Sequence, residues 1–325
     1  MSFRSPSIQR TKEDSNPAFG TYFMNKFDLS IIIISYNTEK ITIDCLKSII
    51  KSLKNSSLKY EIIIVDNASK DNSVSSIKKL KSEIKNRNLK INLIENKENI
   101  GFGPANNQAA KIAKSDYLLF LNSDIIVLNA DIEKLYNFYK QNEKLFNFLG
   151  GKLLNKDMTS QPSCGPMYTL PMVLAHLFLR GDYWGLTRYS PNKIKEADWI
   201  SGACILTKKE YFEKLDGFDE KIFMYMEEID LFYRAKKHGF KVFFYPEAQF
   251  IHLGSQSSAR RSFPILQVYQ GLIYFYKKHF SKFSLFILII MLKLKALIGF
   301  LIGKIINNQY LTQTYAKAWQ ISKMD

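Results

Sequence analysis

Short apolar runs alternate with amphipathic segments in the first half of the chain, and this alternation most constrains the fold. The runs are "LSIIIIS", "YEIIIVD", "KINLIE" and "DYLLFLN". Each is rich in apolar residues and too short for most helices, which is typical of a buried strand. The segments between them, such as "ITIDCLKSIIKSLK", carry apolar residues at helical spacing. The pattern predicts an α/β fold with a mixed, mostly parallel central sheet flanked by helices.

Polar residues follow every predicted strand. They are Ser35 and Asn37, Asp66 and Asn67, Asn99 to Gly103, and Asn122 to Asp124. Ligands bind at the carboxyl ends of the strands in such sheets, so we expect these residues to form one site. The last group interrupts the apolar run "LLFLNSDIIVL". Burying Asp124 there without a partner would be costly, so we expect the strand to end near Leu121 and open into a cleft.

The charge of the chain is strongly positive and is concentrated near its end. The formal net charge is +16, from 46 Lys and Arg against 30 Asp and Glu. Such an excess predicts an anionic partner. The basic residues after position 255 are mixed with long aliphatic runs, which favours an anionic membrane surface over nucleic acid. Three cysteines without C-x-x-C spacing fit a reducing compartment.

The sequence divides into three parts. Residues 1–26 are predicted to be a polar, flexible tail, 27–280 the folded domain, and 281–325 membrane-associating helices. Lys293 and Lys295 interrupt the apolar C-terminal part. A lysine near the bilayer centre costs about 2.5–3.5 kcal/mol, so we expect helices that lie in the membrane interface with their lysines reaching the phosphates. The alternative is a helical pair that caps the domain core.

Asp124 and His252 are the candidate metal ligands. A carboxylate directly after a strand can bind a hard divalent cation, Mg²⁺ or Mn²⁺, that bridges a substrate diphosphate. The alternative for "NSD" is an ordinary strand-end turn. His252 in "FIHLGS" follows an apolar strand and could be a metal ligand, a phosphate contact or a structural residue.

Two loops are candidates for nucleotide contacts. Asp66 could accept the imino N–H of uracil or thymine, or form an Asx turn that leads into a helix. In "NIGFGPANN", Gly101 and Gly103 would let the backbone approach a phosphate or sugar closely. Asn106 stands where G-x-G-x-x-G would require a third glycine, so the segment is not a dinucleotide fingerprint.

The candidate catalytic carboxylates lie in "FMYMEEID" near the start of a predicted helix. Glu227 and Asp230 are three residues apart and share a face, whereas Glu228 points elsewhere. Acids at a helix N-terminus often only complement its dipole. The apolar residues before them indicate a buried or cleft-lining position instead, where a carboxylate could act as a general base.

Together these motifs resemble the family 2 inverting glycosyltransferases with the GT-A fold, particularly their rhamnosyltransferase-like branch. The resemblance covers roughly residues 27–280. The matching segments are "SIIIISYN", "IIIVDNASKDNS", "NKENIGFGPANNQA", "YLLFLNSD", "DWISGACILTKKEYFEKLDGFDE", "FMYMEEIDLFYRAKKHG" and "FIHLGSQS".

The resemblance implies roles for particular residues. The nucleotide would be held by Ser35, Asn37, Asp66 and Asn67, and the base, ribose and diphosphate region would be lined by Asn99, Gly101, Phe102, Gly103 and Asn107. Asp124 corresponds to the last acid of the D-x-D motif, here reduced to Asn122, Ser123 and Asp124, and His252 to a histidine that can complete the metal site. Trp199 and Gly202 match positions that shape the sugar and acceptor pocket. Glu228 stands where the branch usually has an aspartate base, and Glu227 is the other candidate.

The resemblance implies transfer of rhamnose or a hexose from a dTDP or UDP donor, with inversion. The basic, apolar C-terminal segment favours a lipid-linked glycan acceptor and a peripheral position on the cytoplasmic face of the inner membrane. A soluble protein acceptor is the competing possibility. A sugar nucleotidyltransferase would usually carry a glycine- and basic-rich signature near the first strand, which "SIIIISYNTEK" lacks. A catalytically silent membrane protein that keeps the cleft is the other alternative, because "EE" and "NSD" depart from the usual motifs.

Overall fold

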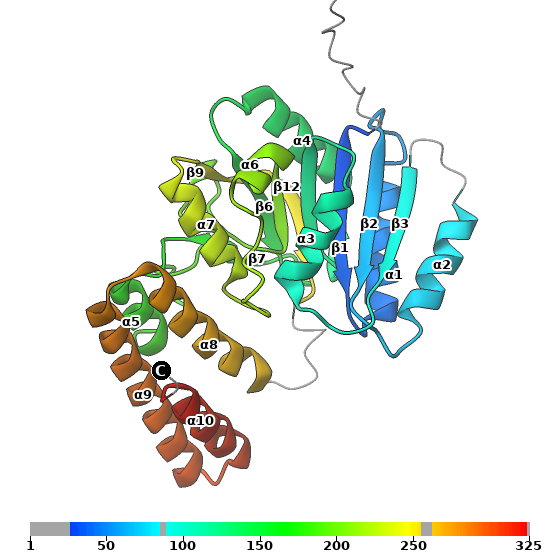
Figure 1. Cartoon of the computed structure of the whole chain (residues 1–325). Helices are drawn as coiled ribbons and strands as arrows, with labels where there is room; N and C mark the ends of the chain where they lie inside the picture. The colour runs from blue at the N-terminus through cyan, green and yellow to red at the C-terminus, as the bar shows by residue number, and fades with distance from the viewer. Residues whose placement is uncertain (1–26, 85–88, 255–261, 324–325) are drawn as a thin grey trace, which may run out of the picture.

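A computed structural model describes residues 27–84, 89–254 and 262–323, with the side chains of 262 and 263 left out. The tail predicted for residues 1–26 lies outside these ranges. Within them, ten strands form one central sheet, and helices cover both of its faces (Figure 1). The predicted α/β class with a mixed sheet is confirmed.

The first half of the sheet is parallel, as the alternation of strands and helices predicts. Along the sheet the strands follow the order β3-β2-β1-β4-β11-β6-β12-β5, with β7 paired to β6 and β9 to β12. The pairs among β1 to β4 are parallel, β11 is antiparallel to both of its neighbours, and β12 is parallel to β6. The main strands are β1 (Leu29–Ser35), β2 (Tyr60–Asp66), β3 (Leu89–Glu95), β4 (Tyr117–Asn122), β5 (Ile125–Val127), β6 (Phe148–Leu154), β11 (Cys204–Lys208) and β12 (Val242–His252). The short strands are β7 (Ser160–Gln161), β8 (Cys164–Gly165), β9 (Lys195–Glu196) and β10 (Trp199–Ile200), and β8 pairs with β10 in a separate two-stranded sheet.

Alternate residues of the central strands enter opposite cores, because successive side chains of a strand point to opposite faces. Ile31 and Ile33 pack against the helices of one face, and Ile32 packs against those of the other. The first face is covered by α1 (Glu39–Ser52), α2 (Ser73–Glu83) and α4 (Asp131–Asn142). The second is covered by α3 (Phe102–Ile112), α6 (Lys209–Lys214) and α7 (Glu227–Lys237). Burial on both faces explains why these strands are apolar runs without alternation.

Four further helices extend the second core away from the sheet. They are α5 (Leu170–Phe178), α8 (Ser262–His279), α9 (Lys282–Ile305) and α10 (Gln309–Ile321), and they lie together at one end of the molecule (Figure 1). One side of α9 packs inward through Leu288, Leu292 and Ala296. Gly299 and Gly303 allow α10 to approach closely, since a Cβ at Gly299 would lie 2.3 Å from Tyr315. The other side of α9 is exposed and apolar, so this helix both packs on the domain and presents an apolar face.

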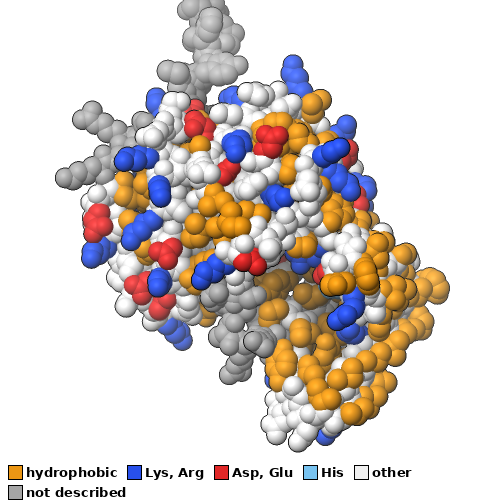
Figure 2. Space-filling view, turned by 180° about the vertical axis from the view of Figure 1, so that it is seen from behind, with side chains coloured by type: hydrophobic (Ala, Val, Ile, Leu, Met, Phe, Trp, Pro, Cys, Tyr) orange, Lys and Arg blue, Asp and Glu red, His pale blue; other side chains and the backbone are white. Residues whose placement is uncertain are grey.

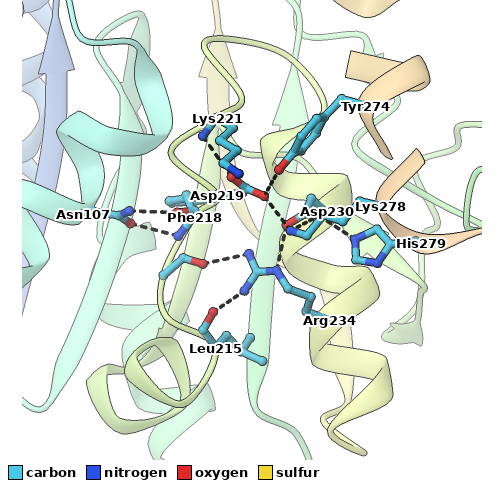
Figure 3. A network of polar contacts seen from close by, with 11 residues as sticks. Asn107, Leu215, Phe218, Asp219, Lys221, Asp230, Arg234, Tyr274, Lys278 and His279 are labelled. Carbon is cyan, nitrogen blue, oxygen red and sulfur yellow. Dashed lines mark hydrogen bonds and ion pairs between the residues drawn. The ribbon is translucent and has the colours of Figure 1, made fainter. Parts of the chain in front are cut away.

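An ion-pair network ties α7 to α8 and to the loop before α7 (Figure 3). The carboxylate of Asp230 is fully buried and accepts from Arg234 Nε at 2.7 Å, Lys278 Nζ at 2.8 Å and His279 Nε2 at 2.6 Å. Lys278 also bonds Asp219 at 2.6 Å. Burial opposes the charged form of Asp230, but the His279 hydrogen bond and the positive charges of Arg234 and Lys278 outweigh it and hold its pKa well below the usual range.

The loop that leads into α3 depends on a glycine. Gly101 has φ +94°, and a Cβ there would lie 2.6 Å from the carbonyl oxygen of Phe223. The N–H of Phe102 donates to this same carbonyl at 2.9 Å. Gly101 therefore fixes the loop of residues 99–103 against the segment that precedes α7.

Replacing Gly101 with alanine is expected to destabilise the protein more than replacing Gly239, whose φ is +74° but whose Cβ would have open space. Both substitutions carry a backbone strain of about 1–2 kcal/mol. Gly101→Ala adds an overlap with backbone, which typically costs a further ~1–3 kcal/mol. Urea unfolding of the two variants measures the difference, and equal losses would contradict the close packing on Phe223.

Replacing Asp230 with asparagine is expected to lower the free energy of unfolding by about 3–5 kcal/mol, because Arg234, Lys278 and His279 lose the buried anion that they share. Since the pKa of Asp230 is lowered on folding, its contribution is present above the unfolded pKa of about 3.9 and is lost as the pH falls below it. Urea unfolding at neutral and acidic pH should therefore show the gap between wild type and Asp230→Asn narrowing below about pH 4. The exposed Asp44→Asn on α1 is the control and should differ little from wild type at either pH.

Candidate functional site

The carboxyl ends of β1, β2 and β4 meet at one edge of the sheet. In the parallel register Ser35 lies beside Asp66, and Ile34, the residue before Ser35, lies beside Asn122. Three polar strand ends are thus neighbours in space although they are up to 87 positions apart in sequence. The expectation that these residues gather at one edge is met by the geometry.

The loop after β2 forms the Asx turn that was one of the two alternatives for Asp66. The two carboxylate oxygens of Asp66 accept from the N–H and the hydroxyl of Ser69, at 2.8 and 2.6 Å. The hydroxyl of Ser69 in turn accepts from the N–H of Asn37 at 2.8 Å. Carboxylate oxygens accept more than one hydrogen bond each, so the turn leaves Asp66 able to bind a further donor. Ser35 is buried and bonds Thr42.

A second network joins this loop to the glycine loop before α3. The amide nitrogen of Asn67 donates to Asn99 Oδ1 at 3.1 Å and to the Gly101 carbonyl at 3.0 Å. Asn96 Nδ2 donates to Asn67 Oδ1 at 2.9 Å. Asn67, Asn99 and Gly101 are therefore brought together, with Phe102 half-buried at the start of α3.

Asn107 faces away from this group. Its amide donates to the Phe218 carbonyl at 2.8 Å and accepts from the Phe218 N–H at 2.9 Å (Figure 3). These two bonds hold the turn at Gly217, so the role implied for Asn107 at the nucleotide gives way to a structural one. Gly103 likewise packs on Phe218, where a Cβ would lie at 3.1 Å from its side chain.

Asp124 and His252 are neighbours at the end of β4 and β12. Asp124 Oδ1 lies 3.3 Å from His252 Nε2, and Asn122 Nδ2 lies 3.4 Å from the same nitrogen. Asn122 Oδ1 is buried without a hydrogen-bond partner. Ser123, between Asn122 and Asp124 in the sequence, is also buried. The run that looked like an interrupted strand is a strand, a two-residue turn and a second short strand, β5, so the carboxylate of Asp124 emerges at the turn.

The orientation of the His252 ring is set by Gln161, a residue that no sequence motif singled out. The Gln161 amide nitrogen donates to Asn155 Oδ1 at 3.0 Å and to the His252 carbonyl at 3.3 Å, which turns its oxygen toward the ring. This oxygen accepts from His252 Nδ1 at 2.6 Å. With the proton on Nδ1, the lone pair of Nε2 points toward Asp124, which is how metal-binding histidines are usually held.

These residues fit a hard divalent cation. The carboxylate of Asp124 and the imidazole nitrogen of His252 are donors that Mg²⁺ and Mn²⁺ accept. Asn122 faces that nitrogen through Nδ2, and its unpaired Oδ1 would become a further donor on rotation of the amide. Within the described ranges no three His, Cys, Asp or Glu side chains cluster as a metal site. The protein therefore offers an incomplete set, which a substrate diphosphate and water would have to complete.

Glu227 and Glu228 begin α7 after a strained turn. Tyr225 and Met226 both have positive φ, +65° and +75°, which is uncommon for bulky side chains and concentrates at functional sites. The Oε2 atoms of both glutamates are buried without a hydrogen-bond partner. Burial raises the pKa of both carboxyls. The charge of Glu228 raises the pKa of Glu227 further, whereas a backbone hydrogen bond and then the charge of Arg188 act to lower that of Glu228.

Asp230 does not join these glutamates. Its carboxylate is engaged in the ion pairs with Arg234, Lys278 and His279 (Figure 3), so its predicted catalytic role is replaced by a structural one. Glu227 and Asp230 are three residues apart, as the prediction required. Asp230, however, lies where α7 packs against α8, and there it binds Lys278 and His279.

Gly202 connects the glycine loop to the candidate base. A Cβ at Gly202 would lie 3.8 Å from Glu228 Cβ and 3.9 Å from Phe102 Cε1. Burial and then the charges of Glu227, Glu228 and Asp124 raise the pKa of Tyr225, which places both ends of the site within electrostatic reach of one hydroxyl. Trp199 is buried, its indole N–H donates to the Pro166 carbonyl at 2.8 Å, and its ring lies under the guanidinium of Arg188.

Comparisons with known proteins show which sequences this chain is similar to. Residues 30–162 match the model of Glycosyl transferase family 2. The chain is 25% identical over 218 residues to the N-acetylglucosaminyl-diphospho-decaprenol L-rhamnosyltransferase of Mycobacterium tuberculosis, covering 61% of this chain and 68% of that protein. It is 27% identical over 232 residues to the rhamnosyltransferase WbbL of Escherichia coli K12, covering 68% and 82%.

A solved structure shares the fold. It is the mannosyltransferase PcManGT of Pyrobaculum calidifontis in complex with GDP-Man and Mn²⁺, which aligns with a TM-score of 0.54 and 14% identity over 92% of this chain and 87% of that one. The predicted GT-A fold is confirmed. The family model over residues 30–162 and the two rhamnosyltransferase relatives support a family 2 glycosyltransferase that is similar to the rhamnosyltransferases.

Proposed function

We propose that the protein transfers rhamnose or a hexose from a pyrimidine nucleotide diphosphate donor to a hydroxyl of a lipid-linked glycan, with inversion at the anomeric carbon. The observation that carries this proposal is the buried, unpaired oxygen of Glu228, which lies with Phe102 around Gly202, together with the Asp124–His252 pair at the strand ends. A general base and a site for the departing diphosphate would then act on one anomeric carbon from two sides, as a single displacement requires.

The donor would lie along the edge of the sheet. Asp66 is available to accept the imino N–H of a pyrimidine, and Asn67, Asn99 and Gly101 form the rigid loop beside it. The half-buried ring of Phe102 would contact the base or ribose. Asp124 and His252, with Asn122, would hold Mg²⁺ or Mn²⁺, which would neutralise the charge that grows on the leaving diphosphate.

Glu228 would act on the acceptor. Its raised pKa makes the ionised carboxylate a stronger base than an exposed glutamate, and burial and the charge of Glu228 raise the pKa of the neighbouring Glu227 as well. As the acceptor oxygen bonds to the anomeric carbon, the bond from that carbon to the diphosphate oxygen breaks and the hydroxyl proton passes to Glu228. Attack from the side opposite the leaving group inverts the configuration, and no second nucleophile is needed.

A lipid-linked acceptor is supported by the surface of the C-terminal helices. Among the described residues, helix α9 has the length and the apolar composition that would allow it to cross a membrane. Its outward side chains include Phe283, Phe286, Ile290, Leu294, Leu301 and Ile305. Hydrophobic side chains gather over this end of the molecule (Figure 2). Together with the lipid-linked acceptor named for the mycobacterial rhamnosyltransferase, this favours a peripheral enzyme on the cytoplasmic face of the inner membrane.

Glu228→Gln is expected to lower the rate of transfer by roughly 10²- to 10⁴-fold, because glutamine cannot accept the hydroxyl proton. The donor is first found by thermal-shift screening of pyrimidine nucleotide sugars with and without Mn²⁺. Its affinity should be unchanged in the variant. Glu227→Gln is the matched control and should keep most of the rate, since a protonated glutamate and a glutamine have nearly the same shape and charge.

Failure of every pyrimidine nucleotide sugar to stabilise the protein would contradict the proposal. Donor binding without transfer to any lipid-linked acceptor would favour the catalytically silent alternative. A wild-type rate that does not fall as the pH is lowered toward the raised pKa of Glu228 would argue against its role as the base.

Gln161→Leu is expected to raise the Mn²⁺ concentration needed for half-maximal donor binding by about 10- to 100-fold, because His252 loses the acceptor that fixes its proton on Nδ1. Thermal shift at saturating donor with increasing Mn²⁺ measures this change. Gln141→Leu, at an exposed position of α4, is the control and should bind Mn²⁺ like wild type. Equal Mn²⁺ requirements in the two variants would remove Gln161 from the metal site.

A further inference from the structure

Arg188 is a half-buried cation next to the candidate base and has no carboxylate within ion-pair distance among the described residues. Its Nε is buried without a hydrogen-bond partner. Arg188 donates one long hydrogen bond, from Nη2 to the Pro162 carbonyl at 3.4 Å. A buried guanidinium nitrogen that lacks a partner is costly, so this arrangement suits a group that an anionic ligand completes.

The surroundings of Arg188 hold it in place without neutralising it. The guanidinium carbon lies 5.5 Å from the centre of the Trp199 ring, and Tyr168 lies against the same ring at 6.1 Å between centroids. The nearby Asp182 is engaged by His176 at 3.2 Å and by the hydroxyl of Thr187. Aromatic stacking thus fixes the plane of the guanidinium while its charge stays available.

Arg188 lies between the membrane-facing helices and Glu228. It is in the segment that follows α5, in which Leu179, Trp184 and Leu186 are exposed. The end of α5 is fastened to α9 by Lys295, whose Nζ donates to the Leu177 carbonyl at 2.6 Å. On its other side Arg188 stacks on Trp199 of β10, and β10 packs against α7, the helix that carries Glu228.

A diphosphate is the anion that this position would meet first in a lipid-linked acceptor. The lipid chain would remain at the apolar face, and the accepting sugar would have to reach Glu228. A guanidinium forms two parallel hydrogen bonds with phosphate oxygens, which fixes orientation as well as charge. The donor diphosphate has its own candidate site at Asp124 and His252.

We propose that Arg188 binds the diphosphate of the lipid-linked acceptor and thereby positions the accepting hydroxyl at Glu228. This inference rests on the proposed function and adds to it a residue that reads the acceptor. Binding also has a consequence for the base. When the phosphate neutralises Arg188, the positive charge that lowers the pKa of Glu228 is offset, and the carboxylate becomes a stronger base as the acceptor arrives.

The test uses the full chain, with farnesyl diphosphate as the probe and EDTA present so that the donor metal site cannot bind it. Farnesol, which lacks the diphosphate, measures binding of the lipid chain alone. We expect wild type to prefer farnesyl diphosphate, and Arg188→Gln to weaken its binding by roughly 10- to 100-fold with farnesol unaffected. Lys193→Gln, an exposed cation of the same segment, is the matched control and should bind like wild type.

Three outcomes would overturn the proposal: no preference for the diphosphate in wild type, unchanged affinity in Arg188→Gln, or an equal loss of affinity for the pyrimidine nucleotide with Mn²⁺. The last would place Arg188 at the donor or in the fold. Arg188→Lys guards against misfolding, because it keeps the charge and should restore part of the affinity. Nucleotide binding by wild type is measured separately, so failure of the proposed function itself would show there and not in the farnesyl diphosphate arm.

Discussion

The parallel register of β1, β2 and β4 is the constraint on which the site depends. Because the strands run in the same direction, with Ser35 beside Asp66 and Ile34 beside Asn122, these polar strand ends arrive at one edge together. A shift by one residue in any pair would turn these side chains toward the other face of the sheet and expose the apolar residues of that strand. Burial of Ile31 to Ile33 and Ile62 to Val65 therefore fixes the position of the polar strand ends as well as the core.

The carboxyl pair at the start of α7 is held against a considerable energetic cost. Two glutamates with unpaired buried oxygens and two successive left-handed residues would each be unfavourable alone. The compensation lies one turn further along the helix, where Asp230 binds three groups (Figure 3). Gly271 of α8 packs on the strained turn as well, since a Cβ there would lie 2.8 Å from Met226 Cγ. Strong ion pairs beside a strained site are what allow the glutamates to remain without partners.

Features that depend on neighbouring residues could be predicted from the sequence, and features that depend on distant contacts could not. The strands, the gathering of polar residues at their ends and the fold class follow from local pattern. Asp124 and His252 were paired by the family resemblance, and they are 3.3 Å apart. Asn107 and Asp230 have polar side chains on apolar helices, a pattern that fits a ligand contact and a structural bond equally well. Their partners, Phe218, Lys278 and His279, come from segments whose positions only the folded chain determines. Gln161 and Arg188 lie within residues 155–197, where apolar residues show neither helical nor strand periodicity. No spacing there distinguishes a functional residue.

The helices that would meet the membrane are also part of the support of the base. α8 contributes Lys278 and His279 to Asp230, and through Gly271 it contacts the turn that aims Glu227 and Glu228. The same helix packs against α10 and against α9, whose outer face is apolar. α5 leads to Arg188 and is fastened to α9 by Lys295. An acceptor whose lipid chain lies on the apolar face of α9 would thus meet Arg188 first and Glu228 next. The first residue follows α5 and the second is supported by α8, and both of these helices pack against α9. A site assembled in this way ties the geometry of the base to the surface from which a lipid-linked substrate must approach.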